Sequence, residues 1–202
     1  MLLHEKLKSY RLILASQSPR RRQLLSEAGL KYELAPRFEC EELYPADIAA
    51  ADVAEFLSRL KSEAYPSALC EKDILLTADT VVVAQGEILG KPANRDDAFA
   101  MLRMLSGYEH EVITGVTLRS TKQTKSFSAH SKVRFRNLTD EEICYYIDTY
   151  HPMDKAGSYG IQEWIGYVGI EGIEGSFFNV MGLPIQRVWC ELDKFIGLEY
   201  LL

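Results

Sequence analysis

The sequence predicts an α/β fold, with strands and helices mixed along the chain and two lobes around a cleft. Two observations carry this prediction. Apolar runs that suit short buried strands, such as Leu12–Leu14 and Ile74–Ala84, alternate with stretches of helical apolar spacing, such as Val53–Leu60. The chain of 202 residues is 47% hydrophobic and 26% charged, which allows a substantial core in one large domain or two small ones.

The first expected strand and helix follow one another closely. Residues 1–10 suit a short helix, and Leu12–Leu14 suit a buried strand. Ser18 can accept a bond as a helix N-cap, and Pro19 fits the first helical position because its missing N–H costs nothing there. Gly29 is a suitable C-terminal stop.

The start of this helix is a candidate phosphate site. Ser16 and Ser18 precede it, and Arg20–Arg22 lie in its first turn. A helix N-terminus favours an anion, and arginine adds bidentate donors for phosphate oxygens. A capped surface helix with a solvated basic run is the plainer interpretation. Capping does not account for three consecutive arginines, so the sequence favours phosphate.

The next expected elements are a strand at Lys31–Leu34 and a long helix that begins at Pro45–Asp47, with Asp47 as its cap. Lys61 lies on the edge of the apolar face of that helix. From its position alone, we favour a core-edge lysine that extends its ammonium to water over a charge directed into a cleft.

The remaining elements follow from turn and cap signals. They are a hairpin partner at Glu87–Leu89 after the Gln85-Gly86 turn, a helix from the Asn94 cap to about Leu105, strands at Glu111–Arg119 and Phe127–Phe135, a helix after the Thr139 capping box, ordered glycine-rich loops and strands from Gly157 to Gly182, and a last helix or strand from Ile185.

Asp79 is the strongest candidate for chemistry. It lies in the middle of the β-branched run Ile74–Ala84, where an ionised carboxylate is costly unless it is paired, metal-bound or at an open strand end. An aspartate bonded to the backbone of a nearby loop is the plainer alternative. The cost of burial favours a general base or a metal ligand.

Two later stretches carry weaker signals. Lys91 follows Gly86–Gly90, which is one residue too short for a Walker A loop and has Pro92 in place of Ser or Thr. Lys91 suits a phosphate contact or a solvated turn. Gln162 ends the loop Asp154–Gln162, and its amide can both donate to and accept from the edge of a nucleobase.

Charge and cysteine usage limit the partners. The formal net charge of −6 argues against a nucleic-acid partner. The four cysteines are widely spaced, without the pattern of a zinc site or a disulfide framework. The first residues are too charged for a signal peptide, and no apolar run is long enough to span a membrane. We therefore expect a cytoplasmic protein with no membrane partner.

Four stretches in order resemble the Maf family of nucleoside triphosphate pyrophosphatases, which were once linked to septum formation. They are Ala15–Arg21, Ala78–Val82, Leu89–Pro92 and Asp154–Gln162. The resemblance implies a single domain over residues 1–202, with a mixed twisted sheet, flanking helices and two lobes, similar to the inosine triphosphatase (Maf/Ham1) fold. The Gly-Ile-Gln form resembles the dTTP/UTP branch, whereas a branch acting on 7-methyl-GTP has Glu in place of Gln162.

The resemblance also implies roles for individual residues, a divalent cation (Mg²⁺ or Mn²⁺) and a homodimer. Asp79 corresponds to the catalytic base. Glu41 and Asp79 correspond to the metal ligands. Because Phe38–Glu42 departs from the family pattern, Glu39 or Glu42 could serve in place of Glu41. Glu163 replaces a common glycine. The specificity positions are Arg20, Thr80 and Gln162, and the phosphate contacts are Ser16, Arg20, Arg21, Lys61 and Lys91.

The expected activity is hydrolysis of pyrimidine nucleoside triphosphates at the α-phosphorus. The substrates would be dTTP and UTP, with CTP and modified pyrimidine forms as further candidates, and the products a nucleoside monophosphate and pyrophosphate. Two alternatives stay open: a 7-methyl-GTP pyrophosphatase, and a nucleotide-binding regulator of cell division with little turnover.

Overall fold

The computed structural model describes residues 2–199, which form two compact units. The first unit comprises Met1–Asp79, Thr114–Ala129 and Gly182–Leu202, and the second comprises Thr80–Ile113 and His130–Met181. The chain therefore passes from one unit to the other within three long strands, β3 (Asp73–Ala84), β5 (Glu109–Arg119) and β6 (Thr124–Phe135).

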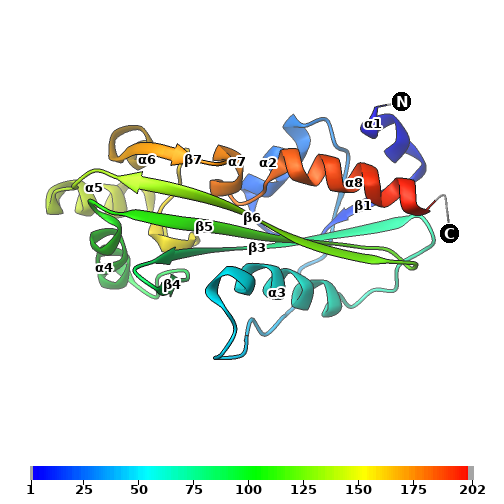
Figure 1. Cartoon of the computed structure of the whole chain (residues 1–202), viewed down its shortest axis with the longest axis horizontal. Helices are drawn as coiled ribbons and strands as arrows, with labels where there is room; N and C mark the ends of the chain where they lie inside the picture. The colour runs from blue at the N-terminus through cyan, green and yellow to red at the C-terminus, as the bar shows by residue number, and fades with distance from the viewer. Residues whose placement is uncertain (1, 200–202) are drawn as a thin grey trace. The chain divides into compact units, whose positions relative to one another are not determined.

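The strands form a mixed sheet. Over residues 2–199 it has seven strands in the order β2-β1-β3-β5-β6-β7, and β4 pairs with β3 outside this path (Figure 1). β1 (Arg11–Leu14) runs parallel to β2 (Glu33–Leu34) and to β3. β4 (Glu87–Leu89) is antiparallel to β3, and β7 (Ile170–Glu174) is antiparallel to β6. The predicted α/β class with a mixed sheet is confirmed.

The first unit contains helices as well as the parallel strands. They are α1 (Leu3–Lys6), the 3₁₀ helix η1 (Leu7–Ser9), α2 (Pro19–Glu27), α3 (Ala50–Glu63) and α8 (Ile185–Glu199). The buried side chains Leu12, Ile13 and Leu14 explain why β1 forms an inner strand. The guanidinium of Arg11 binds both carboxylate oxygens of Asp73 at 2.8 and 2.6 Å, which joins the first residues of β1 and β3.

The second unit contains α4 (Arg95–Leu105), α5 (Asp140–Tyr150), the 3₁₀ helix η2 (Ala156–Ser158), α6 (Trp164–Gly169) and α7 (Phe177–Val180). Both caps predicted for this unit, Asn94 and Thr139, are confirmed. The Asn94 side chain accepts a bond from the Asp97 N–H, and Thr139 forms a reciprocal capping box with Glu142. The hairpin at Gln85-Gly86 is also confirmed, and both residues have positive φ, as a two-residue turn requires.

Three local predictions were wrong in detail. The long helix begins at Ala50, and not at Pro45–Asp47, because its N-cap is Ala49, whose side chain cannot cap, while Asp47 lies in the preceding turn. Ser18 is the N-cap of α2, but its side chain makes no capping bond. The strand expected at Lys31–Leu34 is limited to Glu33–Leu34, both exposed at the edge of the sheet.

Packing of α3 depends on a close approach in the first unit. A side-chain carbon on Gly115 of β5 would lie 2.2 Å from the backbone of Ala54 in α3. Glycine therefore allows the helix to lie directly against the strand. A buried polar chain adds to this contact: Thr77 donates to the Ser58 carbonyl oxygen at 2.6 Å, and the Ser58 and Thr117 hydroxyls are 2.8 Å apart.

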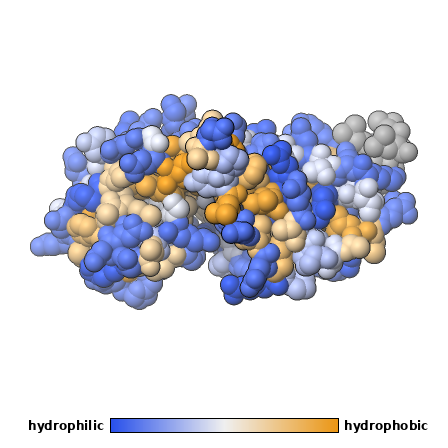
Figure 2. All heavy atoms as spheres, turned by 90° about the horizontal axis from the view of Figure 1, so that it is seen from below, coloured by the Kyte–Doolittle hydropathy of each residue, from blue (hydrophilic) through white to orange (hydrophobic). Residues whose placement is uncertain are grey.

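The face seen in Figure 2 is largely hydrophilic, with hydrophobic patches among the polar side chains. Within residues 2–199, no helix combines the length and the apolar character that a membrane crossing requires. The four cysteines, Cys40, Cys70, Cys144 and Cys190, all carry free thiols.

Candidate active site

The turn between β1 and α2 is organised by Arg21. Its Nη1 donates to the Ser16 hydroxyl at 3.0 Å and to the Ala78 carbonyl oxygen at 2.8 Å, and its Nε donates to the Gly182 carbonyl oxygen at 2.7 Å. Burial lowers the pKa of this guanidinium, while the negative charge of Asp79 acts in the opposite direction. Arg21 thus holds the backbone next to Asp79 and the hydroxyl predicted to bind phosphate.

The three arginines that the sequence places together in the first turn of α2, Arg20–Arg22, do not share one direction. Consecutive helix positions differ by about 100° around the axis, so the three side chains leave α2 in different directions. Arg21 turns towards Ser16 and the backbone of β3. Arg20 is half-buried.

Asp79 lies in the first unit, on β3, with 9% of its surface exposed. Its carboxylate forms an ion pair with the ammonium of Lys61, from the last turn of α3. Lys61 also contacts Glu42 at 3.0 Å, and its side chain is only 16% exposed. Lys61 is therefore a half-buried cation between two carboxylates, and the expectation that its ammonium extends to water was wrong.

The loop before α3 supplies Glu42 to this group. Glu42, and not Glu41, is the carboxylate that the structure places against Lys61. Cys40, two residues earlier, is half-buried nearby, and burial raises the pKa of its thiol while the charge of Lys61 lowers it. The sequence had left Glu39, Glu41 and Glu42 open, because the turn that selects one of them has no local signal.

The second unit carries Thr80, Lys91 and Gln162. Thr80 is half-buried on β3, and Lys91 is exposed two residues after the end of β4. The Gly157 N–H donates to the Gly90 carbonyl oxygen at 3.0 Å, so the loop that leads to Gln162 is bonded to the residue before Lys91. The amide oxygen of Gln162 is buried and has no hydrogen-bond partner.

Sequence reasoning missed a polar cluster beside Gln162, which consists of Tyr146, Lys155 and Glu163. The Glu163 carboxylate accepts a hydrogen bond from the Tyr146 hydroxyl and pairs with the Lys155 ammonium at 3.1 Å. The Tyr146 oxygen in turn accepts from the Gly160 N–H at 3.0 Å. Glu163 was visible in the sequence as a departure from the Maf pattern, but its partners are 8 and 17 positions away and leave no local signature.

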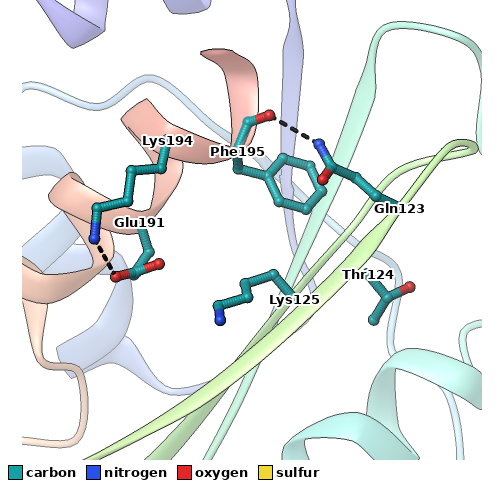
Figure 3. Close-up of a pocket in the computed structure, with 6 residues that line it drawn as sticks. All are labelled: Gln123, Thr124, Lys125, Glu191, Lys194 and Phe195. Atoms are coloured by element: carbon teal, nitrogen blue, oxygen red, sulfur yellow. Dashed lines mark hydrogen bonds and ion pairs between the residues drawn. The ribbon is translucent and has the colours of Figure 1, made fainter. Parts of the chain in front are cut away.

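A separate hollow of about 310 Å³ lies in the first unit, between the end of the β5–β6 hairpin and α8 (Figure 3). It is lined by Gln123, Thr124, Lys125, Glu191, Lys194 and Phe195. Lys194 is paired with Glu191, and Gln123 donates to the Phe195 carbonyl oxygen. This hollow contains none of the predicted site residues.

Comparison with known proteins agrees with the motifs. The family model described as Maf-like protein matches residues 11–195. A dTTP/UTP pyrophosphatase of Bacteroides thetaiotaomicron is 52% identical over 188 residues, which cover 93% of this chain and 97% of that protein. A dTTP/UTP pyrophosphatase of Porphyromonas gingivalis is 50% identical over 95% of this chain and 97% of its own length.

Among solved structures, a HAM1 protein from Coxiella burnetii overlaps with a TM-score of 0.46 at 12% identity, over 92% of this chain and 99% of that one. The family match spans most of the chain and includes Ser16, Asp79 and Gln162. The chain belongs to the Maf family.

Proposed function

We propose that the chain hydrolyses pyrimidine nucleoside triphosphates, dTTP and UTP above all, to the nucleoside monophosphate and pyrophosphate. The observation that carries this proposal is the Asp79–Lys61 pair in a chain that is 52% identical, over 93% of its length, to a dTTP/UTP pyrophosphatase. CTP and modified pyrimidine triphosphates are further candidate substrates.

Asp79 is the proposed catalytic base. It would accept a proton from a water molecule as that water attacks the α-phosphorus, and the bond from the α-phosphorus to the bridging oxygen would break to release pyrophosphate. A positioned carboxylate contributes about 10²–10⁴-fold to such a step. The ion pair with Lys61 holds the carboxylate of Asp79 in place.

The cations of the site would bind the triphosphate. Ser16 and the N-terminus of α2 offer donors to phosphate oxygens, and Arg20, Lys61 and Lys91 add positive charge. Arg21 was predicted as a phosphate contact. Its bonds to Ser16 and to the Ala78 carbonyl oxygen support a role in holding the site in shape.

A divalent cation, Mg²⁺ or Mn²⁺, belongs to this proposal. Mg²⁺ is typically held by one or two carboxylates together with substrate phosphates. Asp79 and Glu42 fit that role because both carboxylates contact the Lys61 ammonium and therefore lie close to one another. Among the residues that the structure describes, no three His, Cys, Asp or Glu side chains form a metal-binding group, so the substrate would complete the ligand set. When bound, the cation would neutralise charge on the phosphates.

Glu41, next to Glu42 on the same loop, stays a predicted metal ligand.

Gln162 would read the base, with Thr80 and Arg20 as further specificity positions. Uracil and thymine present two carbonyl acceptors around one ring N–H, and an amide complements that pattern. A single functional domain over residues 1–202, a homodimer and a cytoplasmic location also remain predictions.

A pyrophosphate-release assay with dTTP, UTP, CTP and 7-methyl-GTP, with and without Mg²⁺ or Mn²⁺, tests the proposal. We expect kcat/KM to be highest for dTTP and UTP, and activity to be lost when EDTA removes the metal. A preference for 7-methyl-GTP would assign the chain to the other branch. Tight nucleotide binding without turnover would support the regulator instead.

A further inference from the structure

The segment Gly160–Glu163, which carries Gln162, is fixed by a largely buried polar cluster of Tyr146, Lys155 and Glu163. Tyr146 is fully buried on α5, and Lys155 is 7% exposed. Because the cluster contains a carboxylate, an ammonium and a phenol, burying it is costly unless its groups are paired. Here each of them has a partner: the Glu163 carboxylate binds both the Tyr146 hydroxyl and the Lys155 ammonium.

The cluster holds the chain on both sides of Gln162. On one side, the Tyr146 oxygen accepts from the Gly160 N–H at 3.0 Å. On the other side, the Glu163 side chain is bound by Tyr146 and Lys155, and the Glu163 N–H donates to the Gly160 carbonyl oxygen at 3.0 Å. Gln162 thus lies between Gly160 and Glu163, and Tyr146 binds both of these residues.

Glu163 marks the start of α6, but its side chain belongs to the cluster. It is the N-cap of α6, but its side chain makes no capping bond. Lys155 and Tyr146 bind it instead. The side chain of Glu163 therefore fixes the segment before α6 through Tyr146 and Lys155.

The confined side chain presents one unpaired group. The amide oxygen of Gln162 is buried without a hydrogen-bond partner, and leaving a buried acceptor unpaired destabilises a folded protein. A ligand that brings an N–H donor to this oxygen removes that cost. Uracil and thymine carry such a donor at the ring nitrogen between their carbonyls, whereas the corresponding nitrogen of cytosine carries a lone pair.

We infer that Tyr146, Lys155 and Glu163 are positioning residues that hold the Gln162 amide oxygen ready for a ring N–H, so that the site selects uracil and thymine over cytosine. This inference rests on the proposed function and deepens it. It concerns the choice of base, whereas Asp79 and Lys61 serve the hydrolysis itself.

The test compares kcat/KM for UTP and CTP in the native protein, in Tyr146→Phe and in Glu163→Gln. We expect the UTP/CTP ratio of the native protein to fall roughly 10-fold in Tyr146→Phe, the equivalent of one well-placed hydrogen bond, mainly through KM for UTP. A merely structural role would lower the values for both substrates alike and leave the ratio unchanged.

Tyr150→Phe is the matched control. Tyr150 stacks on Tyr146 at 5.2 Å, one turn further along α5, and is half-buried. This substitution also removes a tyrosine hydroxyl from α5, but it leaves the bond between Tyr146 and Glu163 in place. The UTP/CTP ratio should therefore stay at the native value. If Tyr146→Phe does not fold, Glu163→Gln keeps the shape of the side chain and carries the test.

The outcomes separate the two proposals. A native protein that hydrolyses no pyrimidine triphosphate overturns the proposed function and this inference with it. Hydrolysis of UTP by the native protein, together with an unchanged UTP/CTP ratio in a folded Tyr146→Phe or Glu163→Gln variant, overturns the inference alone. A ratio that falls equally in Tyr150→Phe also overturns it.

Discussion

The Lys61 ammonium and the Asp79 carboxylate form an ion pair between α3 and β3, 18 positions apart in the sequence. Glu42 contacts the same ammonium at 3.0 Å. Asp79 is therefore a paired carboxylate in a largely buried position, and its charge is stabilised by Lys61. The pair explains how a largely buried strand can carry the carboxylate of Asp79.

The first prediction concerns Asp79→Asn. The variant keeps the shape of the side chain but removes the proposed base, so kcat for dTTP should fall by roughly 10²-fold or more. Asp73→Asn is the control, because Asp73 is also a buried, ion-paired aspartate of β3, bound by Arg11. It should lower the melting temperature without lowering kcat. Equal losses of kcat in the two folded variants, or near-native kcat in Asp79→Asn, would remove Asp79 from the chemistry.

A second prediction concerns the contact that places α3. In Gly115→Ala, the new methyl carbon would lie 2.2 Å from the Ala54 backbone, so the helix must move. We expect the free energy of unfolding to fall by about 3 kcal/mol, at the upper end of overpacking costs. Because α3 carries Lys61, kcat/KM should fall as well.

Gly197→Ala is the control for this experiment. Gly197 lies exposed in α8, and a side-chain carbon there meets nothing within 4 Å. Alanine should raise the free energy of unfolding by about 0.5–1 kcal/mol, because it favours a helix. Urea unfolding measures both variants, and a Gly115→Ala protein as stable as the native one would contradict the close approach of α3 and β5.

A third prediction concerns His110, which is 3% exposed and shares a 2.7 Å hydrogen bond with the Tyr159 hydroxyl. Burial lowers the pKa of His110 to about 4, so the folded protein binds fewer protons than the unfolded chain. The free energy of unfolding should therefore fall as the pH drops from about 6.5 to 4, by about 3 kcal/mol from this group, and should show no further loss from it below pH 4.

The readout is an NMR titration of His110, together with urea unfolding of the native protein and His110→Phe across this pH range. The stability advantage of the native protein over the variant should shrink as the pH falls. A His110 ring that titrates near 6.5 in the folded protein would refute the assigned burial.

The elements that the sequence predicted correctly are those with local signals. Asn94 and Thr139 begin helices because their own side chains bond to the next turn. The first residue of α3 was missed because Ala49 carries no capping group. The Lys61–Glu42 contact, the Gly115–Ala54 approach and the Tyr146–Glu163 bond join residues 17 or more positions apart, and tertiary packing alone brings them together. The motifs therefore predicted candidate residues, but not which of them meet.

A fourth prediction concerns Gln162→Glu. A carboxylate accepts but does not donate, so it would face the carbonyl oxygens of uracil and thymine with repulsion, and it would lie beside the Glu163 carboxylate in sequence. We expect the preference for dTTP over 7-methyl-GTP to fall by roughly 10-fold or more, because hydrogen-bonded sites discriminate strongly. The measurement is kcat/KM for both substrates with both proteins. An unchanged ranking would place base reading elsewhere.

Hydrolysis of dTTP in ¹⁸O-labelled water, with mass analysis of both products, tests the central claim most directly. Water activated by Asp79 should attack the α-phosphorus, so the label should appear in dTMP, and the pyrophosphate should be unlabelled. Label in the pyrophosphate would show attack at the β-phosphorus. Release of dTDP and phosphate, or no reaction at all, would likewise contradict a pyrimidine triphosphate pyrophosphatase that acts at the α-phosphorus.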